Sequence, residues 1–337
     1  MDSNLNRRQA LKLIGLAAFP WQLKGDTGKP LRHHTGDVRK PMGGIFPIMA
    51  TPYTSSNQVD YEDLEKEVEF MTRCGADGMV WPQLASEYGF LSREERRRGM
   101  GVLAKAIKGK KPALVLGIQA ATKEDAVGYA ELAEELAPDA VIAMPPTAAK
   151  SLDDYRDYYR TLSHVVTNRP FFIQTSGGAP AVDPTVDFLF EMARDLPNFG
   201  YIKQEHRPIY ERIYALSKAR PPMKAVFSGP VGLYEMRVGA DGCMPEALYP
   251  DIDKQLWELY HSGRQDQARE IFSKRLLMTA VAEHISGVTA YIMKKRGVFK
   301  NAFSRRENTN MTRYQIQEID FEFEGLRPYM KVQPKAF

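Results

Sequence analysis

The stretch GIFPIMA at residues 44–50 is a continuous apolar run, and a helical pattern carrying Leu64, Val68 and Met71 follows it. A short apolar strand followed by an amphipathic helix is typical of a parallel sheet that is buried on both faces. The same pair of patterns recurs seven more times, with strands expected at 78–81, 113–116, 140–143, 171–173, 201–203, 225–228 and 239–244. The sequence from residue 42 onward therefore predicts eight strands, and a helix follows nearly every one.

Eight such units over roughly 250 residues predict an α/β protein of the (β/α)8 TIM barrel type. An open doubly wound sheet is the alternative, but no G-x-G-x-x-G fingerprint follows an early strand. Further helical patterns beyond the barrel are expected to pack outside it, at residues 252–262, 265–285 and 288–295. The predicted organisation is a barrel over residues 42–250 and a C-terminal helical extension and tail over residues 251–337.

Composition and charge narrow the function classes. The formal net charge of +4 is small and dispersed along 337 residues, which argues against a nucleic-acid partner. Two cysteines exclude a disulfide-rich scaffold and a zinc site of the cysteine type. The histidines form no pair at metal-binding spacing on a helix face. We therefore expect no metal and no cofactor.

The N-terminus has the pattern of an export signal. The motif NRRQALK at residues 6–12 precedes a short apolar run at residues 13–19 and resembles a twin-arginine signal. The run is shorter than the ~20 residues of a membrane-spanning helix, so no stable membrane span is expected. The sequence predicts a signal segment at 1–24, a linker at 25–41, and export by the twin-arginine machinery to the periplasm. The alternative is an amphipathic N-terminal helix on a cytoplasmic protein.

Lys203 is the strongest candidate for chemistry. It ends the apolar run 199–202 and is followed by the polar stretch QEHR at residues 204–207. Burial favours the neutral amine, which can attack a ketone. Catalytic groups of a TIM barrel lie at the C-terminal ends of its strands, and Lys203 falls at that end of the sixth predicted strand. The alternative is a solvated lysine at the end of a strand.

Several short motifs occur in a specific order: GGIFP at 43–47, ATPY at 50–53, GADG at 75–78, SE at 86–87, LSREER at 91–96, IK at 202–203, SG at 228–229 and GADG at 239–242. In this order the chain resembles the dihydrodipicolinate synthase and N-acetylneuraminate lyase family of class I pyruvate-type aldolases, from residue 43 to residue 299. The resemblance implies that Lys203 forms a Schiff base with pyruvate or another 2-oxo acid. It also implies a homo-oligomer.

The chain departs from the family pattern at several positions. The second loop of the family reads GTTGE or GSTGE, whereas residues 83–87 read QLASE, so both hydroxyl positions are apolar. The tyrosine that ends strand five in the family falls on Gln174, and an arginine used for a second carboxylate falls on Ala179. An amide cannot exchange a proton as a phenol can. These departures argue against dihydrodipicolinate synthesis and favour another 2-oxo acid, sugar-derived acids included.

Residues near the expected positions of the family site are the remaining candidates. Glu205 and His206 are candidate proton carriers beside Lys203, and the alternative for His206 is a solvent-facing residue at a helix N-terminus. The other candidates are expected to bind substrate: Ser86, Glu87, Gln174, Thr175, Ser228 and Gly229. The hydroxyl groups of Ser86 and Thr175 are expected to donate hydrogen bonds. The alternative for Glu87 is an anchor of the second loop.

Three functions are compatible with these residues. The first is a Schiff-base lyase or aldolase of a 2-oxo acid. The second is a non-catalytic barrel that binds a sugar acid or a similar small ligand, since several family side chains are replaced. The third is a metal-dependent barrel hydrolase or aldolase, against which the absence of a His and carboxylate cluster at the strand ends argues.

Overall fold

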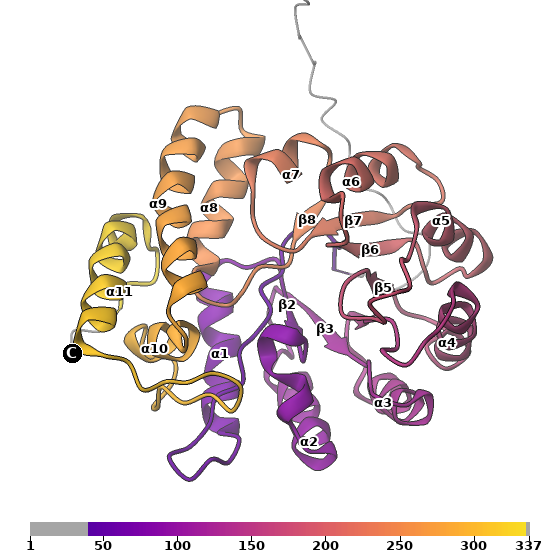
Figure 1. Ribbon diagram of the computed structural model, residues 1–337, viewed down its shortest axis with the longest axis horizontal. Helices are drawn as coiled ribbons and strands as arrows, with labels where there is room; N and C mark the ends of the chain where they lie inside the picture. The colour runs from indigo at the N-terminus through magenta and orange to yellow at the C-terminus, as the bar shows by residue number, and fades with distance from the viewer. Residues whose placement is uncertain (1–39, 335–337) are drawn as a thin grey trace, which may run out of the picture. The chain divides into compact units, whose positions relative to one another are not determined.

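The structure of the protein, a computed structural model, describes residues 40–334 (Figure 1). The predicted signal segment 1–24 lies outside the described residues, as does all but the end of the predicted linker 25–41. None of the helices within residues 40–334 is long and apolar enough to cross a membrane.

Eight parallel strands form one sheet in the order β1-β8-β7-β6-β5-β4-β3-β2. Ile48 forms single bridges with Val80 of β2 and with Glu246, which brings the two edges of the sheet together. The predicted TIM barrel is thereby confirmed. The strands are β1 (Gly44–Ile45), β2 (Gly78–Trp81), β3 (Ala113–Gly117), β4 (Ala140–Ala143), β5 (Phe171–Gln174), β6 (Tyr201–Gln204), β7 (Ala225–Ser228) and β8 (Gly242–Cys243).

The first and last strands are shorter than the sequence predicts. Strand β1 ends at Ile45, because Pro47 has no N–H to donate to a neighbouring strand. Ile48 then rejoins the sheet through its single bridges. Strand β8 begins only at Gly242, since Gly239 has a φ of +99° and belongs to the turn that follows α7 (Leu233–Arg237).

Helices follow the strands and surround the barrel (Figure 1). Side-chain caps mark several of their starts, for example Asp60, Ser92 and Thr122, which accept hydrogen bonds from backbone N–H groups of the first turn. The helices between consecutive strands, besides α7, are α1 (Tyr61–Cys74), α2 (Arg93–Ala106), α3 (Lys123–Leu136), α4 (Leu152–Val165), α5 (Val186–Asp195) and α6 (Ile209–Lys218).

The C-terminal helices begin with α8 (Pro250–His261), which packs beside β1 and α1 and occupies the eighth helical position of the barrel. Helix α9 (Gln265–His284) packs against α8, and α10 (Val288–Lys295) follows it. The additional C-terminal helices are confirmed. A further helix that the periodicity did not predict, α11 (Arg313–Leu326), packs against α9.

The interior of the barrel is filled by large side chains from alternate positions of the strands. Phe46, Phe172 and Phe227 pack edge to face, with ring centroids 5.1 Å apart for Phe46 and Phe227 and 5.2 Å apart for Phe172 and Phe227. A Cβ atom on Gly242 would lie 2.4 Å from the Phe227 ring, so only glycine fits beside it. The polar residues nearer the C-terminal ends of the strands therefore lie above a closed apolar layer.

Candidate active site

Lys203 points into the barrel, because strand residues two apart share one face and Tyr201 belongs to the interior cluster. The residue is 2% exposed. Its Nζ lies 3.1 Å from Oε1 of Glu205. The structure therefore brings together a buried amine and a carboxylate at the C-terminal end of β6.

The Glu205 carboxylate is held by neighbouring groups. Its Oε2 accepts a hydrogen bond of 2.6 Å from the Ser176 hydroxyl. The backbone N–H groups of Glu205 and His206 donate to Oγ1 of Thr175, at 2.9 and 3.1 Å. A Cβ atom on Gly229 would lie 2.4 Å from Oε1 of Glu205. Thr175 thus shapes the loop, and Gly229 leaves room for the carboxylate.

Gln174 ends β5 directly beside Lys203 in the sheet register. Its amide Nε2 donates to the Ser176 hydroxyl at 3.0 Å. Its Oε1 is buried and has no hydrogen-bond partner in the part of the chain that the structure describes. A buried acceptor without a partner is costly, so Gln174 is suited to accept a hydrogen bond from a ligand.

A cavity of about 710 Å³ lies above this cluster. Its lining includes four of the predicted site residues, namely Lys203, Glu205, Gln174 and Gly229. A cavity of this size suits a small-molecule ligand. Five other predicted site residues are not part of the lining: Ser86, Glu87, Thr175, His206 and Ser228.

Three of those five residues contact other groups of the protein. The Ser86 hydroxyl donates to the backbone oxygen of Met49 at 2.5 Å, and the Ser228 hydroxyl donates to that of Pro230 at 2.8 Å. The His206 ring lies 3.4 Å from the Asp183 carboxylate. Of the two predicted proton carriers, the structure places Glu205 and not His206 beside Lys203.

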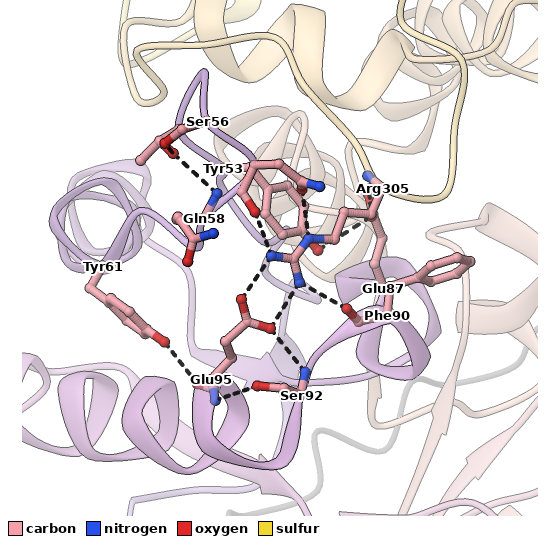
Figure 2. Close-up of polar contacts among 11 residues, drawn as sticks. Tyr53, Ser56, Gln58, Tyr61, Glu87, Phe90, Ser92, Glu95 and Arg305 are labelled. Atoms are coloured by element: carbon pink, nitrogen blue, oxygen red, sulfur yellow. Dashed lines mark hydrogen bonds and ion pairs between the residues drawn. The ribbon is translucent and has the colours of Figure 1, made fainter.

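Glu87 anchors the segment 304–306 above the second loop. Its Oε1 accepts a 2.6 Å hydrogen bond from the Ser304 hydroxyl, and its Oε2 accepts from the backbone N–H groups of Arg305 and Arg306 at 2.9 and 3.1 Å. Figure 2 shows the Arg305 guanidinium, which donates to both oxygens of Glu95 at 2.8 and 2.7 Å. The segment thereby carries Arg306 to the cavity wall.

Sequence reasoning missed several residues that line the cavity, among them Tyr210 of α6, Glu235 of α7, Tyr249 at the start of α8, and Arg275 of α9. The negative charge of Glu235, together with burial, raises the pKa of Tyr210. Burial also raises the pKa of Glu235 itself. Tyr210 follows Lys203 by only seven residues, whereas Glu235, Tyr249 and Arg275 lie farther along the chain. No local motif marks any of the four.

Asp253 of α8 lies behind the cavity wall and pairs with Arg275, with 3.3 Å between Oδ1 and Nε. The residue is fully buried, and burial raises its pKa to about 6 despite the Arg275 charge. The folded state therefore holds a proton on Asp253 that the unfolded chain releases near pH 4. Its contribution to the free energy of unfolding is largest at low pH and falls as the pH rises from about 4 to 6.

We expect the pH dependence of stability to differ between wild type and Asp253→Asn. The free energy of unfolding of wild type should fall relative to the variant by on the order of 2 kcal/mol between about pH 4 and pH 6.5. Urea unfolding of both proteins across this range measures the difference. Parallel pH profiles would show that Asp253 carries no raised pKa.

No group of three or more His, Cys, Asp or Glu side chains within residues 40–334 is arranged to hold a metal ion. The two cysteines, Cys74 and Cys243, are free and buried.

The closed barrel of eight parallel strands with helices around it is an aldolase-type fold. Residues 41–319 match the Dihydrodipicolinate synthetase family, and the chain belongs to that family.

Curated relatives differ in their reactions. The chain is 25% identical over 208 residues to the N-acetylneuraminate lyase of Citrobacter koseri. The aligned part is 61% of this chain and 69% of the relative. It is 24% identical over 265 residues to the L-2-keto-3-deoxyarabonate dehydratase of Azospirillum brasilense, which covers 75% of this chain and 84% of the relative. Family members are thus lyases, dehydratases and synthases, and the family alone does not define the substrate.

Solved structures share the fold. The sialic acid aldolase of Ruminococcus gnavus superimposes with a TM-score of 0.78 at 19% identity, over 85% of this chain and 97% of that one. Dihydrodipicolinate synthase from Rhodopseudomonas palustris superimposes with a TM-score of 0.76 at 21% identity, over 84% and 97%.

Proposed function

We propose that the protein is a Schiff-base-forming lyase or aldolase that acts on pyruvate or another 2-oxo acid, sugar-derived acids included. The observation that carries the proposal is the buried Nζ of Lys203, which lines the cavity 3.1 Å from Oε1 of Glu205. Membership in a family of lyases and synthases supports the same reaction class.

The proposed chemistry begins with attack of the Lys203 amine on the keto carbon. The Lys203–Glu205 ion pair supplies one proton to the carbonyl oxygen during the attack, which gives the carbinolamine hydroxyl. Glu205 then accepts a proton from the attacking nitrogen and returns it to this hydroxyl, which leaves as water. The resulting iminium accepts electrons when a carbon–carbon or carbon–oxygen bond of the substrate breaks or forms. Gln174 stands where the family has a tyrosine, so in this proposal the proton transfers are assigned to Glu205.

Borohydride trapping tests the proposal. The purified protein is incubated with pyruvate and with longer 2-oxo sugar acids, reduced, and read by intact mass and peptide mapping. We expect a mass increment on the peptide that carries Lys203, since borohydride converts the iminium to a stable secondary amine. A folded protein that shows no increment with any acid of the panel would overturn the proposal.

Replacing Glu205 with glutamine should lower turnover by about 10²-fold, because an amide cannot carry the proton. Steady-state kinetics with the acid that traps best measures the loss. Ser176→Ala is the matched control, since it removes a hydrogen bond from Glu205 but leaves the carboxylate, and it should cost less. Equal turnover for wild type and Glu205→Gln would exclude Glu205 as the proton carrier.

The alternative function is a non-catalytic barrel that binds a sugar acid or a similar small ligand. One observation favours it: Leu84 and Ala85 line the cavity where the family pattern has hydroxyl side chains. Simple binding does not need the Lys203 amine. Thermal stabilisation by sugar acids that is equal in wild type and Lys203→Ala, without any trapped imine, would support this alternative.

A further inference from the structure

The wall of the cavity formed by α9 carries a partly buried guanidinium. Arg275 lines the cavity with a side chain that is 13% exposed. Its Nε lies 3.3 Å from Oδ1 of Asp253, and its Nη1 donates to Oγ1 of Thr279 at 2.7 Å. The guanidinium also lies over the Tyr249 ring, 4.9 Å from the centroid. These contacts fix its position at the wall.

Hydrogen-bonding capacity remains at this wall. The guanidinium has more N–H donors than the two contacts use. The Tyr249 hydroxyl is buried and has no hydrogen-bond partner among residues 40–334, although Tyr249 lines the cavity. A buried hydroxyl without a partner costs free energy in the empty protein, and a bound acceptor would recover it. Cationic donors beside an unpartnered hydroxyl are suited to a carboxylate.

Acidic residues also line the cavity, but they differ in exposure. Glu246 and Glu283 are exposed to solvent, where water screens their charges. Burial raises the pKa of Glu235 and so favours its neutral form. Glu205 is paired with Lys203. The buried Asp253 carboxylate pairs with Arg275 and offsets part of its charge. The attraction of a bound anion therefore rests on the remaining N–H donors of the partly buried guanidinium, which water screens less than it screens the exposed acids.

We propose that Arg275, with Tyr249 and Thr279 beside it, binds a second carboxylate at the far end of the substrate. The substrate class is then a dicarboxylic 2-oxo acid whose keto group reaches Lys203. This assignment rests on the proposed Schiff-base function for the reacting end, while the binding of the distal carboxylate is a separate property. Arg275 is a specificity-determining residue in this assignment.

Binding measured in a protein that cannot form an imine tests the carboxylate site independently of the Schiff-base function. In the Lys203→Ala protein, calorimetric titration gives dissociation constants for pyruvate, 2-oxoglutarate and 2-oxoadipate. At least one dicarboxylic acid should bind about tenfold or more tightly than pyruvate, since a bidentate guanidinium contact adds to affinity. Arg275→Gln combined with Asp253→Asn should abolish this preference, and the added Asp253→Asn avoids leaving a buried unpaired carboxylate.

Arg275→Lys is the second variant, since it keeps the charge beside Asp253 but loses the planar fork, and it should retain part of the preference. Asp253→Asn alone is the matched control and should keep the preference. Equal affinities for the three acids, or a preference that survives the loss of Arg275, would overturn the assignment. An Arg275-dependent preference in a protein whose wild type traps no imine would refute the Schiff-base function alone.

Discussion

Replacing Lys203 with methionine is expected to lower the turnover of the 2-oxo acid substrate by at least about 10³-fold. Methionine is close to lysine in length but has no amine, so no iminium can form and the electron sink is lost. A loss of 10³ corresponds to about 4 kcal/mol of activation free energy. Steady-state kinetics measures it, and borohydride with the same acid should leave the mass of the variant unchanged.

A lysine outside the cavity provides the matched control. Lys218 ends α6 and is exposed, so Lys218→Met should keep both turnover and trapping at the wild-type level. The thermal midpoint of Lys203→Met should stay close to that of wild type, which separates loss of chemistry from loss of fold. Turnover within tenfold of wild type in a folded Lys203→Met protein would contradict the role of Lys203.

The barrel was predictable from the sequence because each of its units is local. An apolar run predicts a strand such as Ala113–Gly117, and helical periodicity with a cap such as Thr122 predicts the helix after it. The prediction was least accurate at β1 and β8. Strand ends depend on hydrogen bonds to another part of the chain, and at Pro47 the expected strand pairing stops.

The candidate site was predictable only in part. Lys203 follows from its place at the end of a strand, since strand ends converge in a barrel. The 3.1 Å contact to Glu205 depends on the turn that Thr175 stabilises from the neighbouring strand. The segment at 304–306 that Glu87 anchors, and Arg275 of α9, reach the cavity from distant parts of the chain. No local pattern encodes such an approach, because tertiary packing alone determines it.

A buried ion pair connects the barrel with the C-terminal helices, and its loss is expected to lower stability strongly. Asp251 of α8 and Arg296 form a bidentate pair, with 3.0 Å between Nη1 and Oδ1 and 2.8 Å between Nη2 and Oδ2. Both side chains are fully buried. The guanidinium also donates to the backbone oxygens of Leu248 and Val332, at 3.0 and 2.8 Å. One buried cation thus connects the start of α8, the end of α10 and the C-terminal tail.

Arg296→Met is expected to lower the free energy of unfolding by about 3–5 kcal/mol, because the Asp251 carboxylate stays buried without its partner. Chemical denaturation at neutral pH measures the loss. Arg269→Met is the matched control on α9, where the pair with Asp266 is exposed at 75% and 92%, and its cost should be below about 0.5 kcal/mol.

The double variant Asp251→Leu/Arg296→Met distinguishes two explanations of that loss. If the cost comes mainly from the uncompensated charge, removing both partners should recover part of the stability, since an apolar pair needs no solvation. If the cost comes from the connections to Leu248 and Val332, the double variant should be no more stable than Arg296→Met. A single variant as stable as wild type would contradict both explanations and show that the buried pair does not hold the C-terminal helices on the barrel.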